Sequence, residues 1–494
     1  MTSSPLDGIV LDSRDRRPLY VQIADGIVGL IEGGELHPGD RLPAMRALAT
    51  QLECGLITVS QAYDSLVARG RACARVGKGT FITKPVDPIA SIERRWEPEI
   101  GTLMRARMEG LSERLARADV PGTVSMAYAH PAPETFPMAE FGRCLQSVLT
   151  EDPPEVMQYG TPHRSDAAVA AGDAELRETL ARALRTRGVS AAANNIIVCS
   201  GAQQAADLVA GTLLESRSLV AAESPSYAPT LAVFDARGVG YVEIAADADG
   251  LRVDDVERVF AEYRPRLFYV NPFAQNPTGT ILPQRRAKAI VELARRYDVV
   301  VLEDQTGWVF TYDAAPPAPL AAHDRDGRVV LIESLSKSIF PALRIGYLFA
   351  KGALHSALTE AKARADSFTS TLMQRALRRF LNSPAYSRHL RSARALYQNR
   401  RDHLLVRLAQ AIPWAEILPP QAGMTLWFSL PPSISTGAAF EACAREKLLV
   451  MPADASYPTR SGPAALRLGF GDLDEPTIDE AVIRLARAMR TFRS

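Results

Sequence analysis

Five short apolar runs, separated by stretches with helical periodicity, constrain the fold of this chain more than any other feature of its sequence. They cover residues 195–199, 218–222, 266–270, 299–302 and 329–332. Strands that are buried on both faces of a parallel sheet are near-continuous apolar runs, and parallel neighbours need a crossover connection that is usually a helix. The alternation therefore predicts a mostly parallel sheet covered by helices.

Residues suited to ligand binding follow each of these runs. Ligands of an open parallel sheet bind beyond the carboxyl ends of its strands, so the residues just after the runs are candidates for one shared site. In chain order they are residues 200–203, Tyr227, residues 271–279, residues 303–304 and Lys337.

Lys337 and Arg344 stand seven residues apart after the last run and indicate the chemistry of this site. A lysine amine forms an imine with an aldehyde, and an arginine guanidinium binds a phosphate group. Pyridoxal 5'-phosphate (PLP) carries both an aldehyde and a phosphate. We therefore expect PLP as the cofactor.

The other strand ends offer groups for the same molecule. Free backbone N–H groups at a helix beginning with Ala202 and Gln203 suit its phosphate. The ring of Tyr227 can lie on the pyridine face, an asparagine of residues 271–279 can donate to the phenolic oxygen, and a buried Asp304 would keep the ring nitrogen protonated. Each of these features alone is often a turn, a cap or a packing residue, but their shared placement favours one cofactor site.

Residues 15–83 have the pattern of a small separate unit. Pro18 begins a helical pattern that Gly33 and Gly34 end, and further helices are expected at about 44–52 and 56–69. A glycine-containing hairpin is expected within 71–82. Three short helices followed by a hairpin predict a winged helix-turn-helix.

The motifs of this unit resemble the GntR family of bacterial repressors. They are PLYVQI from Pro18, GELHPGDRLP from Gly34, TVSQAY from Thr58 and GKGTF from Gly77. The resemblance implies binding to double-stranded DNA, with candidate contacts from Arg46, Thr58, Ser60, Gln61, Lys78, Gly79 and Thr80. The unit departs from the family pattern at Leu56, where arginine is usual, and Glu53 adds a charge that repels phosphates.

Residues 124–494 resemble the fold-type I aminotransferases, with a major and a minor domain, and the whole chain resembles the MocR regulators. The resemblance implies that Lys337 forms the internal aldimine, that Asp304 pairs with the ring nitrogen, that Asn276 contacts the ring oxygen and that Tyr227 stacks on the ring. Phosphate contacts are implied for Ser334, Ser336, Arg344 and the backbone of Ala202 and Gln203. Tyr159 is implied to reach the site from a second subunit of a homodimer, and Arg467 to bind the carboxylate of a small amino-compound effector.

Residues 84–123 are predicted to be a linker, because prolines or glycines stand at both of its ends and its middle has an amphipathic helical pattern. The formal net charge of +1 means that any DNA contact must come from local patches. The five cysteines form no Cys-x-x-Cys pair, which argues against a disulfide framework and against a zinc or other metal site. No apolar run approaches the length of a membrane span, so we expect a cytoplasmic protein without membrane insertion or export.

Three functions remain open at this point. The leading hypothesis is a PLP-dependent transcriptional regulator that senses an amino compound or the cofactor itself. The alternative is an active aminotransferase with a vestigial DNA-binding domain, and a weaker third is a sensor of PLP alone that controls vitamin B6 synthesis. Asp304 is followed by Gln305 and Thr306 rather than by the tyrosine usual in these aminotransferases, which favours a sensor over an efficient enzyme.

Overall fold

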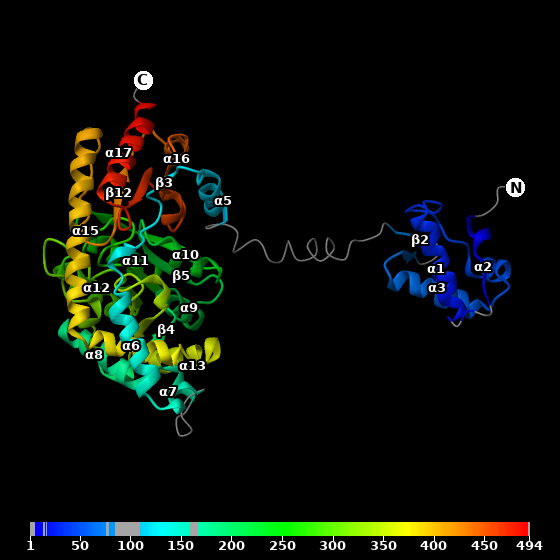
Figure 1. Ribbon diagram of the computed structural model, residues 1–494, viewed down its shortest axis with the longest axis horizontal. Coiled ribbons are helices and arrows are strands. Elements are labelled where there is room, and N and C mark those ends of the chain that lie inside the picture. Colours follow the sequence, from blue (N-terminus) through cyan, green and yellow to red (C-terminus); the bar gives the residue numbers. More distant parts are fainter. Residues whose placement is uncertain are drawn as a thin grey trace. The chain divides into compact units, whose positions relative to one another are not determined.

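The computed structural model describes residues 5–12, 15, 17–75, 79–83, 109–158 and 166–492. The chain divides into two compact units, residues 1–101 and residues 102–494 (Figure 1).

The smaller unit contains the predicted three helices and hairpin. Its elements are the 3-10 turn η1 (Pro5–Gly8), α1 (Leu19–Glu32), α2 (Met45–Gln51), α3 (Leu56–Ala68), β1 (Ala72–Arg75) and β2 (Gly79–Ile82). Ile23 and Ile27 of α1 pack with Leu48 of α2 and with Val59 and Leu66 of α3, and all five are fully buried. The two strands pair antiparallel. The prediction of a winged helix-turn-helix is confirmed.

An eight-stranded sheet organises the larger unit, in the order β4-β11-β10-β9-β8-β5-β6-β7. Its strands are β4 (Ile196–Cys199), β5 (Leu219–Ser224), β6 (Gly240–Asp247), β7 (Gly250–Leu251), β8 (Leu267–Val270), β9 (Val300–Asp304), β10 (Val329–Ser334) and β11 (Gly346–Phe349). All five predicted apolar runs are strands of this sheet. Neighbouring pairs from β10 to β6 are parallel, and β11 runs antiparallel to both β10 and β4. The carboxyl ends of β4, β5, β8, β9 and β10 therefore share one edge.

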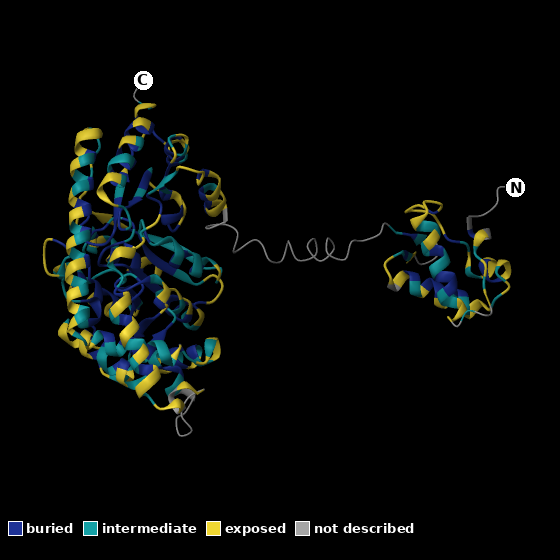
Figure 2. Ribbon diagram, viewed as in Figure 1, coloured by how far each residue is buried: buried dark blue, intermediate teal, exposed yellow. Residues whose placement is uncertain are grey.

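Helices cover both faces of the sheet because successive strand residues point to opposite sides. In β4, Ile196 and Val198 belong to one apolar core, and Ile197 and Cys199 belong to the other. Figure 2 shows the buried sheet between helices that are exposed on their outer sides. The helices are α6 (Met138–Glu151), α7 (Asp166–Ala170), α8 (Ala174–Thr186), α9 (Ala202–Leu213), α10 (Ala228–Asp235), α11 (Val253–Tyr263), α12 (Gln284–Tyr297), α13 (Gly352–Asp366) and α14 (Thr371–Leu381), with 3-10 turns at η2 (Pro133–Thr135), η3 (Pro154–Met157), η4 (Ala193–Asn195), η5 (Leu320–Ala322) and η6 (Pro341–Leu343).

A minor lobe with its own apolar core completes the larger unit. The 28-residue helix α15 (Pro384–Ala411) runs alongside both lobes (Figure 1). The other elements are α5 (Glu109–Ala118), β3 (Val124–Ser125), β12 (Thr425–Ser429), α16 (Thr436–Arg445), β13 (Leu448–Leu449), β14 (Met451–Pro452), η7 (Ala453–Ser456), β15 (Ala465–Gly469) and α17 (Glu475–Arg490). Strands β12, β15 and β14 form an antiparallel sheet, and β13 pairs in parallel with β3. The fold class of a fold-type I aminotransferase behind a winged helix is confirmed.

Part of the segment predicted as a linker packs against this minor lobe. Residues 84–108 lie outside the described residues, but α5 places Leu111, Leu115 and Ala118 in the core of the minor lobe. The guanidinium of Arg114 lies 4.8 Å from the ring centroid of Phe440. Residues 109–118 are therefore a docked helix of the larger unit.

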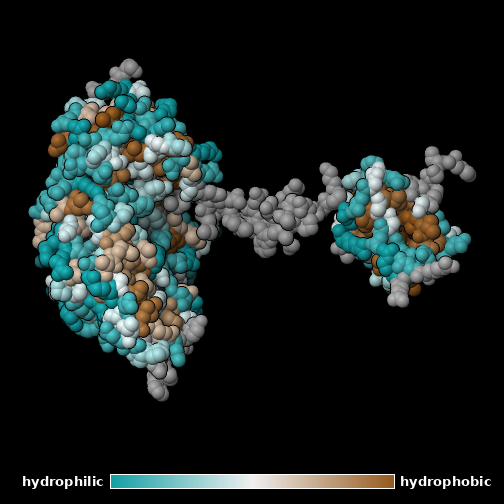
Figure 3. Space-filling model, viewed as in Figure 1, coloured by the Kyte–Doolittle hydropathy of each residue, from teal (hydrophilic) through white to brown (hydrophobic). Residues whose placement is uncertain are grey.

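The described residues include no candidate membrane-spanning helix and no candidate metal cluster. Within the described ranges, no helix is long and apolar enough to cross a membrane, and no group of three or more His, Cys, Asp or Glu side chains is placed to hold a metal ion. All five cysteines are unpaired. Apolar residues on the visible face occur as separate patches among hydrophilic ones (Figure 3).

Candidate functional site

The carboxyl edge of the large sheet holds a pocket around Lys337. Four predicted cofactor residues line it: Tyr227, Asn276, Asp304 and Lys337. The Lys337 Nζ donates a hydrogen bond of 2.7 Å to the carbonyl of Ala129, 208 residues away in the chain. Burial, together with the positive charge of Arg467, lowers the pKa of Lys337 to about 8. A larger share of this amine is therefore neutral at neutral pH than in an exposed lysine.

Asp304 is buried at the end of β9 and held by donors on two sides. Its carboxylate accepts a hydrogen bond of 3.1 Å from the Tyr269 hydroxyl and one of 2.9 Å from the Thr306 amide. Burial raises the pKa of Asp304, and the hydrogen bonds from Thr306 and Tyr269 oppose that effect. A protonated ring nitrogen beside Asp304 would also favour the ionised carboxylate.

Tyr269 and Asn271 support this site, and the sequence did not single out their roles. The Asn271 side chain donates to the Asp304 carbonyl at 2.6 Å and accepts from the Asn276 amide at 2.8 Å. Asn271 therefore fixes the distance between Asp304 and Asn276. In the sequence, the only sign of the role of Tyr269 is that it brings a hydroxyl group into an otherwise apolar strand. Its partner Asp304 lies 35 residues away, so no local pattern indicates the hydrogen bond.

Arg467 lies beside Asn276, although the two residues belong to different lobes. Its guanidinium donates to the Asn276 side-chain oxygen at 3.1 Å and to the Ala127 carbonyl at 2.6 Å. The Arg467 Nε is buried and has no hydrogen-bond partner. Burial lowers the pKa of Arg467. A buried guanidinium with a free donor is well suited to a carboxylate ligand.

The predicted phosphate-binding residues come together at the start of α9. Gly201, at φ 97°, precedes this helix, and the Arg344 guanidinium donates to the Ser200 carbonyl at 3.0 Å. A Cβ atom on Gly201 would lie 3.3 Å from Arg344 Nη2, so the arginine passes directly over the glycine.

Serines complete this end of the pocket. Ser334 and Ser336 are buried, and the Ser336 hydroxyl has no hydrogen-bond partner. The Gln203 side chain donates to the Pro229 carbonyl, and its backbone N–H is available to a ligand because it lies in the first turn of α9. Three features fit the phosphate of PLP: the unpaired Ser336 hydroxyl, the Arg344 guanidinium beside Gly201, and the free backbone N–H groups at the start of α9. Tyr159 lies outside the described residues.

The loop after Asp304 contributes two residues to the wall of the Lys337 pocket. Thr306 and Gly307 line the pocket, and Tyr227 is the one tyrosine among its described lining residues. Burial raises the pKa of Tyr227. No phenol from the loop after Asp304 therefore faces Lys337.

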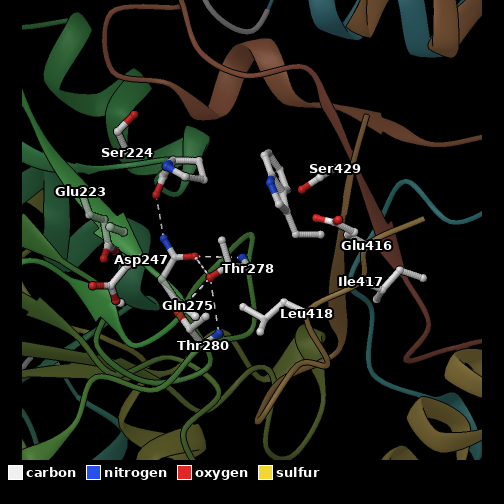
Figure 4. A pocket seen from close by; sticks show the side chains of 15 residues that line it. Glu223, Ser224, Asp247, Gln275, Thr278, Thr280, Glu416, Ile417, Leu418 and Ser429 are labelled. Atoms are coloured by element: carbon white, nitrogen blue, oxygen red, sulfur yellow. Dashed lines mark hydrogen bonds between the residues drawn. The ribbon is translucent and has the colours of Figure 1, made fainter. Parts of the chain in front are cut away.

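A larger cavity of about 700 Å³ is lined in part by Gln275, Thr278 and Thr280, which follow Asn271 in the same loop (Figure 4). Glu223, Asp247 and Gln275 form one wall, and Glu416, Ile417 and Ser429 face them from the minor lobe. Glu223 accepts a hydrogen bond of 2.8 Å from the Asn271 amide, and burial raises its pKa to about 8. Glu223 thus connects this cavity with the residues that hold Asp304.

The candidate DNA-contact residues of the smaller unit differ in how far they are exposed to solvent. Arg46, Gln61 and Gly79 are exposed, Thr58 and Ser60 are half-buried, and Lys78 lies outside the described residues. Thr80 is 7% exposed, and its carbonyl accepts a hydrogen bond from the Leu42 amide. Its side chain is therefore not available at the surface.

Two ion pairs reduce the positive charge of this unit, and one exposed arginine lies beside its hairpin. Arg69 pairs with Asp25 at 2.7 Å, and Arg71 pairs with Glu32 at 3.2 Å. The sequence did not indicate that Arg41 lies over the wing, where a Cβ on Gly79 would be 2.9 Å from the Arg41 Nε.

Comparison with known proteins establishes the family. The model of aminotransferase class I and II matches residues 159–485. The chain belongs to this family. The model of bacterial regulatory proteins of the gntR family matches residues 19–82. Together the two matches confirm the architecture of a MocR-type regulator and its DNA-binding domain.

Two curated regulators align with most of the chain. The probable rhizopine catabolism regulatory protein MocR of Rhizobium meliloti is 24% identical over 492 residues, which are 98% of this chain and 97% of that protein. The HTH-type transcriptional regulator YisV of Bacillus subtilis is 28% identical over 444 residues, covering 88% of this chain and 89% of YisV.

The larger unit also resembles solved enzymes. The crystal structure of LysN, an alpha-aminoadipate aminotransferase from Thermus thermophilus complexed with N-(5'-phosphopyridoxyl)-L-leucine, is 27% identical. The aligned residues cover 80% of this chain and 98% of LysN, with a TM-score of 0.71. The prediction of PLP as the cofactor is thereby confirmed at the level of the family.

Proposed function

We propose that this chain is a PLP-dependent transcriptional regulator whose larger unit senses an amino compound, or PLP itself, and whose smaller unit responds by altered DNA binding. The observation that carries the proposal is the presence, in one chain, of a gntR-type unit and of a pocket lined by Lys337 and Asp304, with Arg467 hydrogen-bonded to its wall. We further propose that it acts in the cytoplasm as a homodimer, with Tyr159 contributed to the partner's site.

Each residue of the pocket is assigned one task in this proposal. PLP supplies an amine-reactive aldehyde and an electron-withdrawing ring when it is bound. Lys337 holds the aldehyde end and Asp304 holds the ring nitrogen. The buried Ser336 hydroxyl, Arg344 and the start of α9 hold the phosphate end.

Effector binding draws on both lobes. The amino group of an effector competes with the Lys337 amine for the aldehyde of PLP, and the carboxylate of the same effector binds Arg467. Because Lys337 belongs to the major lobe and Arg467 to β15 of the minor lobe, such a ligand favours lobe positions that differ from those of the empty pocket. The effector signal is therefore registered as a change in lobe arrangement.

The test compares DNA affinity with and without effector in the full-length protein. DNA selected from a random pool is titrated with PLP-loaded protein, alone and with a panel of amino acids and amines. We expect one class of amino compound to change the affinity and Lys337→Ala to abolish that response while DNA binding itself persists. Lys288→Ala, an exposed lysine on α12, should behave as wild type. A full effector response in the Lys337→Ala protein contradicts the proposal, and a response to PLP alone would identify the cofactor as the effector.

An active aminotransferase is the second candidate, and the free Arg467 Nε beside Asn276 favours it, since this donor can take a substrate carboxylate. The absence of a phenol after Asp304 argues for slow turnover. Steady-state assays with amino donors and a keto acid separate the two functions. Many turnovers per minute without sequence-specific DNA binding would establish the enzyme and exclude the regulator.

A further inference from the structure

Two apolar side chains are exposed at the start of α3, the second helix of the helix-turn-helix. Leu56 is 46% exposed and Ile57 is 75% exposed. Side chains at the start of this helix contact base edges when a helix-turn-helix docks in the major groove of DNA. The pair therefore occupies positions that read sequence.

The rest of this helix face carries no cation. Ser60, Gln61 and Asp64 stand one to two turns after Ile57, and Glu53 and Asp64 are the only charged residues between Ala47 and Ala68. Arginine and lysine read guanine through its O6 and N7 atoms, and this helix has neither. Contacts with phosphates are left to residues outside it, such as the exposed Arg41 and Arg46.

One feature of the major groove is apolar, and it is the 5-methyl group of thymine. Burial of Leu56 and Ile57 against such methyl groups would remove apolar surface from water on both sides. We infer that Leu56 and Ile57 recognise thymine methyl groups, so that DNA bound by this chain has thymine opposite the first turn of α3. The inference rests on the proposed function, because it requires the smaller unit to bind DNA.

Recognition of thymine is tested by selecting DNA sequences that the protein binds and then removing the thymine methyl groups from them. Full-length, PLP-loaded protein selects duplexes from a random pool, and the enriched sequence is rebuilt with thymine or with deoxyuridine, which pairs identically but lacks the 5-methyl group. We expect thymine enrichment at fixed positions. Affinity by fluorescence anisotropy should fall about fourfold per lost methyl contact in the deoxyuridine duplex, the factor that corresponds to one buried CH2 group.

Matched variants assign the effect to the pair. The double variant Leu56→Ser with Ile57→Ser should bind more weakly and lose the difference between the two duplexes. Val67→Ser, at a 41% exposed valine near the end of α3, should keep it. Equal binding of both duplexes by the wild type overturns the inference while leaving DNA binding intact. Failure to enrich any sequence overturns the proposed function and the inference with it.

Discussion

Lys337 shows how a single residue acquires its chemistry from its surroundings. Its place after β10 is set by the sequence, but its pKa of about 8 follows from burial and from Arg467, which comes from the other lobe. An amine must be neutral to attack an aldehyde, so the lowered pKa places this reaction within reach of neutral pH.

We predict that the rate of PLP attachment to the cofactor-free protein rises with pH and levels off above a midpoint near 8. Below the midpoint the neutral fraction of the Lys337 amine falls about tenfold per pH unit. Arg467→Gln should shift the midpoint upward, because it removes a positive charge that disfavours protonated Lys337. Stopped-flow absorbance of the bound cofactor measures the rate, and an unchanged midpoint in the variant would show that Arg467 does not act on Lys337.

At the scale of elements, two junctions use backbone conformations that ordinary residues avoid. Gly201 leads into α9 at φ 97°, and Glu53 stands between α2 and α3 at φ 49°. Glycine suits the first junction, whereas the second carries a side chain that is strained there and bears a charge that opposes DNA binding.

Gly201→Ala is predicted to weaken PLP retention and to destabilise the larger unit by about 1–2 kcal/mol, because alanine disfavours this φ and its Cβ would crowd Arg344. Cofactor loss on dialysis and thermal unfolding measure the two effects. Gly142→Ala, in the interior of α6 where the added Cβ meets open space, is the matched control and should stabilise slightly.

Glu53→Gly is predicted to stabilise the smaller unit by about 0.5–1 kcal/mol, since relief of the left-handed strain exceeds the added chain entropy of glycine. The same change should tighten DNA binding at low salt by removing a negative charge. Glu53→Gln separates the causes, because it should improve DNA affinity without raising stability. Weaker DNA binding by both variants would contradict this assignment.

At the scale of the whole molecule, the chain divides into two units with separate apolar cores. The cofactor residues belong entirely to the larger unit, and the helix-turn-helix belongs entirely to the smaller one. An effector response at the DNA therefore requires a signal that passes from the larger unit to the smaller one.

Calorimetry is predicted to resolve two unfolding transitions in the full-length protein. PLP should raise the midpoint of one transition only, because a ligand stabilises the unit whose native state binds it. Selected DNA should raise the other. A single transition shifted by both ligands would instead show that the two units unfold together.

Sequence alone determined the strands of the large sheet, the helix-turn-helix and the identity of the cofactor. The five apolar runs became strands because continuous burial on two faces is encoded locally, and the helix-turn-helix followed from local helix and turn signals. Lys337 and Asp304 were predicted from their positions after strands and Asn276 from the resemblance to the aminotransferases, and the structure brings the three into one pocket. Their individual roles with PLP remain predictions.

Only the tertiary structure decided how these residues are supported. The hydrogen bond of Tyr269 to Asp304, the contact of Arg467 with Asn276, and the bond from Lys337 to Ala129 join residues 35 to 208 positions apart. Such contacts depend on how strands and lobes pack, and no local pattern records them. The same holds for the strain at Glu53 and the exposure of Ile57, because a residue's φ and its accessible surface are set by the completed fold.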